Sequence, residues 1–399
     1  MNELEHIMKK VLKRVEHPFY FYNLDQLKAH LENITKVLDP DIKLWYACKA
    51  NPLSAILKIL RNLNFGIDIA SMGELEQVMN VGIPGDEIIA TGPAKSKKYL
   101  ETLIDNNVTT IVIESLNQLK WLNQICIEKN IRQDVLLRLQ LEWEDEDNVL
   151  GANKITPFGL GFKDWSAIDL DEFTEIDIRG FHIFQWGNIL SVEKLTEIWS
   201  QTIEKTQELC IEKKINLDII DIGGGLGVPY LSTQSPVDIE QINNVLTALK
   251  KKYKLKKIWM ELGRFTVAEC GYYLTKITDI KKVRGKDIIV TEGGINHCAR
   301  VAITSESFPC SALDQSLSSE LIAYQVHGPL CTSIDMLGEF DLPKDLKVDD
   351  WLVFSKAGAY GFTESMPYFL GHPIAAEVIY YNGDVVIPRP TKNATNWMV

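Results

Sequence analysis

The sequence has 399 residues, of which 46% are apolar and 24% are charged. At roughly 150 residues per domain, this length predicts two or three domains with a large buried core. The composition excludes disordered and collagen-like chains, and no run approaches the ~18 apolar residues of a membrane span. The 42 basic and 54 acidic side chains leave a net charge of −12, which argues against nucleic acid and anionic membranes as partners.

The seven cysteines are widely spread and include no C-x-x-C pair. Their odd number and spacing argue against a disulfide framework and a structural zinc site, so no metal is expected. Residues 1–16 predict an amphipathic helix with Leu4, Ile7 and Leu12 on one face, without the apolar core of a signal peptide. We therefore expect a cytoplasmic protein.

From residue 43 onward, short apolar or β-branched runs alternate with longer amphipathic runs, which is typical of βαβ units. Eight strands are predicted, at 43–48, 66–70, 87–91, 109–113, 134–141, 178–184, 217–222 and 257–262. Helices are predicted at 53–63, 75–79, 97–105, 116–129, 192–214 and 239–254, and the segment 142–174 is irregular. Eight strands in about 220 residues predict a (β/α)8 barrel, although alternation alone also fits a doubly wound sheet.

After Arg264 the pattern changes to strands without long helices between them, at 272–283, 287–291, 321–327, 351–355, 376–381 and 385–388. Asn382-Gly383, between the last two strands, is a type I′ hairpin signal. We expect a barrel at 25–265 followed by a mainly antiparallel β domain at 266–399. An N-terminal helix and strand, residues 1–24, are expected to pack on the β domain.

Chemistry in a barrel of this kind collects at the carboxyl ends of the strands. Lys49 follows the first strand, where desolvation would give a lysine the lowered pKa that imine formation needs. Lys95, after the third strand, is its one rival. The run Gly223-Gly224-Gly225 after the seventh strand suits a backbone turn around one phosphate, with Arg264 as a bidentate cation.

Glu261, inside the end of the eighth strand, is suited to keep a ring nitrogen protonated, and His182 on the sixth is suited to stacking or proton transfer. Taken singly, each of these residues also fits an ordinary structural role. Together, an imine lysine, a phosphate turn and a carboxylate for a pyridine nitrogen describe pyridoxal 5′-phosphate. In the second domain, Cys331 follows Gly-Pro in a turn and suits a weak acid beside a substrate, and Tyr360 lies in a Gly-Ala-Tyr-Gly turn.

Six motifs occur in order and together resemble the fold type III pyridoxal-phosphate decarboxylases, the ornithine, diaminopimelate and arginine decarboxylase group with an alanine-racemase-like barrel. They are Tyr46-Ala-Cys-Lys49-Ala-Asn51, Asp68-Ile-Ala-Ser71-Met-Gly73-Glu74, Asp221-Ile-Gly-Gly-Gly225, Glu261-Leu-Gly-Arg264, Gly328-Pro-Leu-Cys331 and Gly358-Ala-Tyr360. The resemblance covers nearly the whole chain and implies decarboxylation at Cα of a small amino-acid substrate.

The resemblance implies that Lys49 forms the imine with the cofactor, Glu261 binds its ring nitrogen, and Cys331 protonates Cα after CO₂ leaves. The other residues implied at the cofactor are Asp68, Ser71, His182, Phe184, Gly224, Gly225, Gly263, Arg264 and Tyr360. A homodimer with two shared sites is also implied, because a Cys and a Tyr of this domain enter the partner's site in that family.

The sequence departs from the family pattern at informative positions. Phe184 stands where an imidazole normally stacks on the cofactor, which leaves the role of His182 open. Thr332 stands where decarboxylases of basic amino acids hold the distal ammonium with an acid, while Arg300 has the spacing of an arginine that holds a distal carboxylate. Asp335 is a further candidate for an ammonium. The expected substrate contacts are Arg264, Arg300, Cys331, Thr332, Asp335 and Tyr360.

We therefore expect the substrate to be an amino acid or an amino-acid conjugate, as in the branch that serves siderophore and antibiotic pathways. Diaminopimelate-type and ornithine- or lysine-type decarboxylation remain alternatives. A racemase shares the barrel and the lysine but uses a tyrosine as second base where this chain has Cys331. An inactive regulatory homologue is the last alternative, and intact Lys49, Glu261 and Arg264 argue against it.

Overall fold

A computed structural model describes residues 2–143, 155–314, 316–396 and 398. The chain divides into two compact units. Unit 1 comprises Met1–Ala29, Tyr230–Gln234 and Val267–Val399, and unit 2 comprises His30–Pro229 and Ser235–Thr266. The boundary near the N-terminus falls inside helix α2 (Leu24–Val37). None of the described helices combines the length and apolar character needed to cross a membrane.

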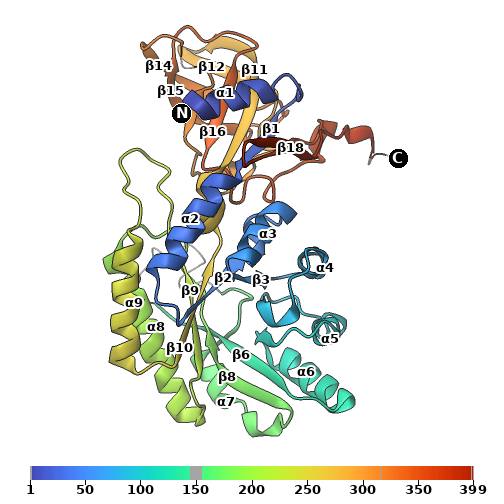
Figure 1. Ribbon diagram of the computed structural model, residues 1–399, viewed down its shortest axis with the longest axis vertical. Coiled ribbons are helices and arrows are strands. Elements are labelled where there is room, and N and C mark those ends of the chain that lie inside the picture. The colour runs from blue at the N-terminus through green and yellow to red at the C-terminus, as the bar shows by residue number, and fades with distance from the viewer. Residues whose placement is uncertain (1, 144–154, 315, 397, 399) are drawn as a thin grey trace. The chain divides into compact units, whose positions relative to one another are not determined.

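Unit 2 is a closed barrel of eight parallel strands, which confirms the predicted fold class (Figure 1). Its strands are β2 (Ile42–Ala47), β3 (Gly66–Ile69), β4 (Ile88–Ala90), β5 (Thr110–Ile113), β6 (Gln133–Gln140), β8 (Ile176–His182), β9 (Ile219–Gly224) and β10 (Lys257–Leu262). Strand β10 pairs with β2 and strand β5 pairs with β6, which closes the ring. A short β7 (Leu160–Gly161) adds to β6, and the predicted irregular segment lies partly outside the described residues.

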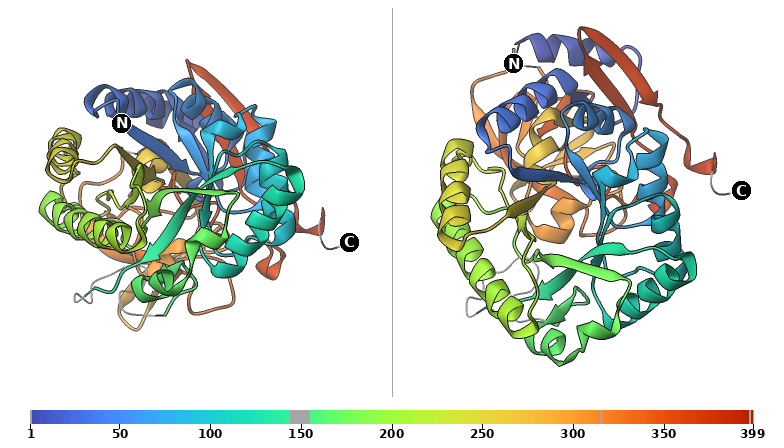
Figure 2. Two further views of the ribbon diagram at one scale, coloured as in Figure 1. Left: turned by 90° about the horizontal axis from the view of Figure 1, so that it is seen from below. Right: turned by 60° about the horizontal axis from the view of Figure 1, so that its bottom comes forward.

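Helices surround the ring of strands (Figure 2). They are α3 (Ser54–Asn62), α4 (Met72–Asn80), α5 (Lys97–Asp105), α6 (Leu116–Lys129), α7 (Phe162–Ala167), α8 (Val192–Lys213) and α9 (Ile239–Tyr253). Four of them follow a serine whose hydroxyl accepts a backbone N–H of the first turn, namely Ser71, Ser96, Ser115 and Ser191. Such caps satisfy N–H groups that have no partner inside the helix, so they fix where each helix begins.

Large apolar side chains fill part of the barrel interior. This cluster consists of Trp45, Ile89, Val112, Leu136, Ile219 and Trp259. The two indole ring centroids lie 4.9 Å apart, and Gly66 makes room for Trp45, because a Cβ there would lie 2.2 Å from its ring. A packed interior leaves the carboxyl ends of the strands as the place for chemistry.

Unit 1 holds a nine-stranded, mainly antiparallel sheet, in agreement with the prediction. Its strands are β1 (Phe19–Asn23), β11 (Gly271–Val283), β12 (Lys286–Thr291), β13 (Cys310–Ala312), β14 (Leu321–His327), β15 (Met336–Pro343), β16 (Trp351–Ser355), β17 (Ala376–Tyr381) and β18 (Asp384–Arg389). Two pairings are parallel, β1 with β17 and β12 with β14. The Asn382-Gly383 hairpin is confirmed, with φ of 52° and 87° as a type I′ turn requires.

Strand β1 lies in the middle of this sheet, between β11 and β17. Its residues Phe19–Tyr22 are completely buried. Helix α1 (Asn2–Val11) contributes Met8 and Val11 to the same apolar cluster as Phe19. The N-terminal helix and strand thus belong to the hydrophobic core of unit 1.

Candidate active site

The site in unit 2 is built around Lys49, which follows β2 in a short 3₁₀ turn, Cys48–Ala50. Its Nζ lies 3.6 Å from Oδ2 of Asp68 and 5.3 Å from the ring centroid of Phe184. The side chain is 41% exposed, which differs from the expectation of a desolvated amine. The amine is therefore oriented by the Asp68 carboxylate and the Phe184 ring, and not by enclosure in the protein interior.

Asp68 on β3 is the buried carboxyl group next to Lys49. Thr91 donates a hydrogen bond of 2.6 Å from its hydroxyl to Oδ1. Burial and the nearby Glu261 raise the pKa of Asp68 to about 7, against the opposing effect of Lys49. The charge of this carboxyl therefore changes near neutral pH.

Glu261 on β10 and His182 at the end of β8 form a buried pair. The Nε2 atom of His182 lies 3.0 Å from Oε1 of Glu261, and the two side chains are 1% and 2% exposed. Burial by itself would raise the pKa of Glu261, but the facing His182, Lys49 and Arg138 outweigh it and hold the pKa below its usual value. A carboxylate held ionised in this way suits a protonated ring nitrogen.

The glycine run Gly223–Gly225 begins inside β9 and continues into a tight turn at the end of the strand. Gly223 and Gly225 have φ of 67° and 76°, and Oδ1 of Asp221 accepts the Gly223 N–H at 2.8 Å. A Cβ on Gly224 would lie 2.3 Å from the carbonyl oxygen of Glu261. Side chains are excluded from this backbone, so N–H groups can approach an anion directly.

Arg264 begins the short helix α10 (Arg264–Val267) directly after β10, and both Arg264 and Gly263 are half-buried. The cation therefore stands at the carboxyl end of the strand that carries Glu261. An amine, a ring-nitrogen carboxylate, a glycine turn and this arginine form a donor set that fits pyridoxal 5′-phosphate.

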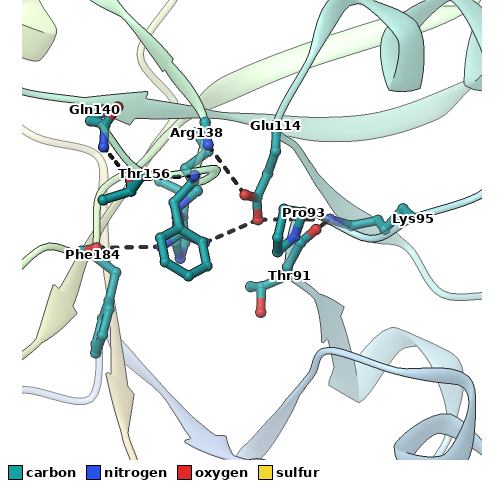
Figure 3. Close-up of polar contacts among 12 residues, drawn as sticks. Thr91, Pro93, Lys95, Glu114, Arg138, Gln140, Thr156 and Phe184 are labelled. Carbon is teal, nitrogen blue, oxygen red and sulfur yellow. Dashed lines mark hydrogen bonds and ion pairs between the residues drawn. The ribbon is translucent and has the colours of Figure 1, made fainter. Parts of the chain in front are cut away.

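A buried ion network supports one side of the site (Figure 3). Glu114 lies between two cations, with Oε1 3.0 Å from Nη1 of Arg138 and 3.9 Å from Nζ of Lys95. Lys95 also donates a hydrogen bond to the carbonyl of Gly92, and Arg138 donates to the carbonyl of Phe184 at 3.3 Å. Burial lowers the pKa of Lys95 to about 8, and its amine is committed to this network. The network therefore fixes the backbone that carries the Phe184 ring.

Ser71 is exposed, and its hydroxyl accepts the Glu74 N–H at 3.2 Å as the cap of α4. Capping of helix α4 is thus a sufficient structural role for Ser71, and this role requires no bound ligand.

In unit 1, Cys331 is an exposed thiol in the turn after β14, and Thr332 beside it is half-buried. Asp335, a further candidate for a substrate ammonium, makes hydrogen bonds to the backbone of unit 1. Its side chain is buried, Oδ1 accepts the Ile295 N–H at 2.8 Å, and Oδ2 accepts the Leu330 N–H at 2.7 Å. Both carboxylate oxygens of Asp335 thus accept backbone N–H groups, and these hydrogen bonds fix the segment that carries Cys331.

Arg300, at the start of α11 (Arg300–Thr304), is already paired within unit 1. Its Nη1 lies 3.1 Å from Glu364 and its Nη2 lies 3.6 Å from Glu306. The guanidinium also lies 5.1 Å from the ring centroid of Tyr360, whose φ is 57°. A substrate carboxylate at Arg300 therefore has to compete with Glu364.

Three buried charged residues were not predicted as site residues, namely Glu114, Arg138 and Asp221, the last of which was named only as part of the glycine motif. Two of them interrupt apolar strands, in Val135-Leu-Leu-Arg138-Leu139 and Ile219-Ile-Asp221-Ile222. A charge at the centre of such a run is costly unless it is paired. Each of these charges therefore indicated, from the sequence alone, that a buried partner is present.

Curated relatives match most of the chain. The chain is 27% identical to the L-glutamyl-[BtrI acyl-carrier protein] decarboxylase of Niallia circulans, over 94% of this chain and 92% of that protein. It is 28% identical to the 2-[(L-alanin-3-ylcarbamoyl)methyl]-2-hydroxybutanedioate decarboxylase of Staphylococcus aureus, over 91% and 94%. It is 26% identical to the diaminopimelate decarboxylase of Aquifex aeolicus, over 97% and 92%.

Solved structures share the fold. Diaminopimelate decarboxylase from Helicobacter pylori, complexed with L-lysine, superposes with a TM-score of 0.87 at 23% identity, over 98% of each chain. The pyridoxal-binding domain of the pyridoxal-dependent decarboxylases matches residues 24–268. The chain therefore belongs to the pyridoxal-dependent decarboxylases, and it is a carboxy-lyase whose cofactor is pyridoxal 5′-phosphate.

Proposed function

We propose that the substrate is an amino acid whose distal nitrogen is acylated, and that the enzyme removes the carboxyl group at its Cα. The proposal rests on the side chains in the segment after Cys331. Thr332 offers only a hydroxyl there, and the carboxylate of Asp335 is occupied by two backbone N–H groups. A distal ammonium would therefore lack a counter-charge in this segment, and an unpaired buried charge costs several kcal/mol.

The names of two relatives support a conjugated substrate. One acts on a glutamyl group carried by a protein, and the other on L-alanine joined through a carbamoyl group to a hydroxybutanedioate. In both substrates the amino acid is joined to a larger group. From such conjugates we infer a role in siderophore or other secondary-metabolite biosynthesis.

We propose the following roles for the side chains of the site. When bound, pyridoxal 5′-phosphate supplies an electron sink for the bond broken at Cα. The Lys49 amine holds the cofactor covalently, Glu261 keeps a proton at its ring nitrogen, and the Cys331 thiol delivers a proton to Cα. Phe184 offers an aromatic face beside Lys49.

We also propose a cytoplasmic homodimer in which Cys331 and Tyr360 of one subunit complete the site of the other. All seven cysteines are free, which is in keeping with a reducing compartment.

A second candidate is decarboxylation of an amino acid with a distal zwitterion, as in diaminopimelate. The ion pair of Arg300 and Glu364 favours this candidate. Arg300 can bind the distal carboxylate of such a substrate while Glu364 binds its distal ammonium.

The test compares kcat/KM for lysine, diaminopimelate and a citryl-acylated diamino acid. Wild type should prefer the conjugate, and Thr332→Asp should move the preference toward lysine by roughly tenfold or more, since a charged hydrogen bond is worth ~1.5–3 kcal/mol. Thr332→Ser is the matched control and should leave the ranking unchanged. A wild-type preference for lysine that Arg300→Ala does not alter would contradict the proposal.

A further inference from the structure

Two irregular segments of unit 1 lie side by side, the loop 292–300 after β12 and the segment 360–373. The loop leads into Arg300 and the segment begins with Tyr360, and both residues are among the expected substrate contacts. The guanidinium of Arg300 lies 5.1 Å from the ring centroid of Tyr360. The relative position of the two segments therefore decides how this cation is presented.

Backbone hydrogen bonds join the two segments at two points. The Ala299 N–H donates to the carbonyl of Glu364 at 3.0 Å. The Met366 N–H donates to the carbonyl of Ile295 at 3.2 Å. Both bonds are made by backbone atoms, so the exchange of a neighbouring side chain leaves them in place.

His297 supplies a third connection through its side chain, which is buried. Its Nε2 lies 2.7 Å from the carbonyl oxygen of Pro373, and its Nδ1 lies 3.0 Å from the hydroxyl of Tyr273 on β11. A carbonyl oxygen only accepts, so Nε2 carries the hydrogen and Nδ1 accepts from the tyrosine. The Asn296 amide nitrogen, 3.3 Å from Nε2, then faces a nitrogen that is itself a donor.

The surroundings of His297 keep its ring neutral and in one orientation. Burial lowers its pKa to about 4, against the opposing effect of the hydrogen bond to Pro373. The Tyr20 hydroxyl donates to the backbone carbonyl of His297 at 2.7 Å. A Cβ on Gly293 would lie 2.4 Å from Nδ1 and 2.2 Å from the Tyr273 hydroxyl, so the ring is closely packed on that side. Its two nitrogens therefore keep separate roles.

We propose that His297 is a positioning residue for substrate specificity, which holds the loop 292–300 against the segment 360–373 and so sets the position of Arg300. The inference rests on the proposed function in taking Arg300 as the contact for a distal carboxylate of the substrate. Loss of the connection should therefore weaken the binding of substrates that carry a distal carboxylate and spare those that lack one.

The test separates the two nitrogens of the ring. His297→Gln places an amide N–H near the position of Nε2 and keeps the hydrogen bond to Pro373, whereas His297→Asn is too short for it. The assay measures kcat and KM for a citryl-acylated diamino acid and for its acetyl counterpart, which has no distal carboxylate. His297→Asn should raise KM for the citryl substrate by roughly 3–10-fold, with kcat and the acetyl KM within about twofold of wild type, since one net hydrogen bond is lost. His297→Gln should restore the citryl KM.

Two further variants keep the test independent of folding. Tyr273→Phe removes a buried hydrogen bond from the same ring but leaves the connection to Pro373, so it should leave the ratio of the two KM values unchanged. Adding His297→Leu to Tyr273→Phe removes both partners of that bond, which costs little stability, and should show the selective loss. This double variant replaces His297→Asn if the asparagine variant does not fold.

Three results would overturn the assignment. An equal rise of KM for both acylated substrates in His297→Asn would make the histidine a structural residue only. Unchanged KM values for both would show that the backbone hydrogen bonds alone place Arg300. A citryl KM in His297→Gln as high as in His297→Asn would show that the bond to Pro373 is not the connection.

A wild-type preference for lysine over both acylated substrates would instead contradict the proposed function. Diaminopimelate and lysine, which differ by one distal carboxylate, then replace the acylated pair in the same comparison of His297 variants. The two failures are thus distinguishable.

Discussion

Replacement of Glu114 by glutamine tests the buried network beside the site. The substitution keeps the shape and an acceptor for the Gly159 N–H, which lies 3.2 Å from Oε2. It removes the one negative charge between Arg138 and Lys95, whose side chains are 8% and 1% exposed. Removing one partner of a buried ion pair typically costs 3–5 kcal/mol. We expect a loss near the lower end, about 3 kcal/mol, because Lys95 can release its proton.

Glu114→Gln should also weaken the binding of the cofactor, because Arg138 donates a hydrogen bond to the carbonyl of Phe184. Urea unfolding of the holoenzyme measures the first effect, and the pyridoxal phosphate dissociation constant measures the second. Adding Lys95→Met to Glu114→Gln should restore part of the stability, since one buried cation is then gone. The control is Glu101→Gln, which breaks an exposed ion pair with Lys98 and should cost nothing measurable. A loss below about 1 kcal/mol for Glu114→Gln would show that the network is not electrostatically coupled.

Three further predictions concern single residues of the site. Lys49→Ala should abolish both turnover and the covalently held cofactor, and borohydride reduction followed by mass spectrometry should find no labelled lysine; a label on Lys95 would reassign the imine. Cys331→Ala should slow turnover by roughly 10²–10⁴ with cofactor affinity intact, and unchanged turnover would remove the thiol from the mechanism. Asp68 has a folded pKa of about 7 against an ordinary value of 3.8, so the folded state binds the extra proton and stability falls as pH rises from about 4 to 7. Asp68→Asn should flatten that part of the unfolding profile, and an identical slope in the variant would contradict the assignment.

The barrel could be predicted because each of its eight strands is a short β-branched or aromatic run between amphipathic segments, as in β2 and β9. Strand β15 was missed because Gly338, with φ of 142°, breaks its alternation beside a register shift. The site was predictable where function leaves a local motif, as at Lys49 and Gly223–Gly225. It was not predictable where partners are distant in sequence, as for Arg300 and Glu364, because no local pattern records a tertiary contact.

The central position of β1 has a consequence for synthesis. Phe19 pairs with Leu274 on one side and with Ala376 on the other, so both neighbours leave the ribosome long after it does. At ~5–20 residues per second that delay is on the order of tens of seconds. During this time an apolar strand, Phe19-Tyr20-Phe21-Tyr22, has two open edges, which is the classical situation for aggregation. The barrel strands, which all lie within residues 42–262, can close first. An N-terminal deletion through residue 23 would remove the middle of a sheet whose other strands are encoded in the last third of the chain.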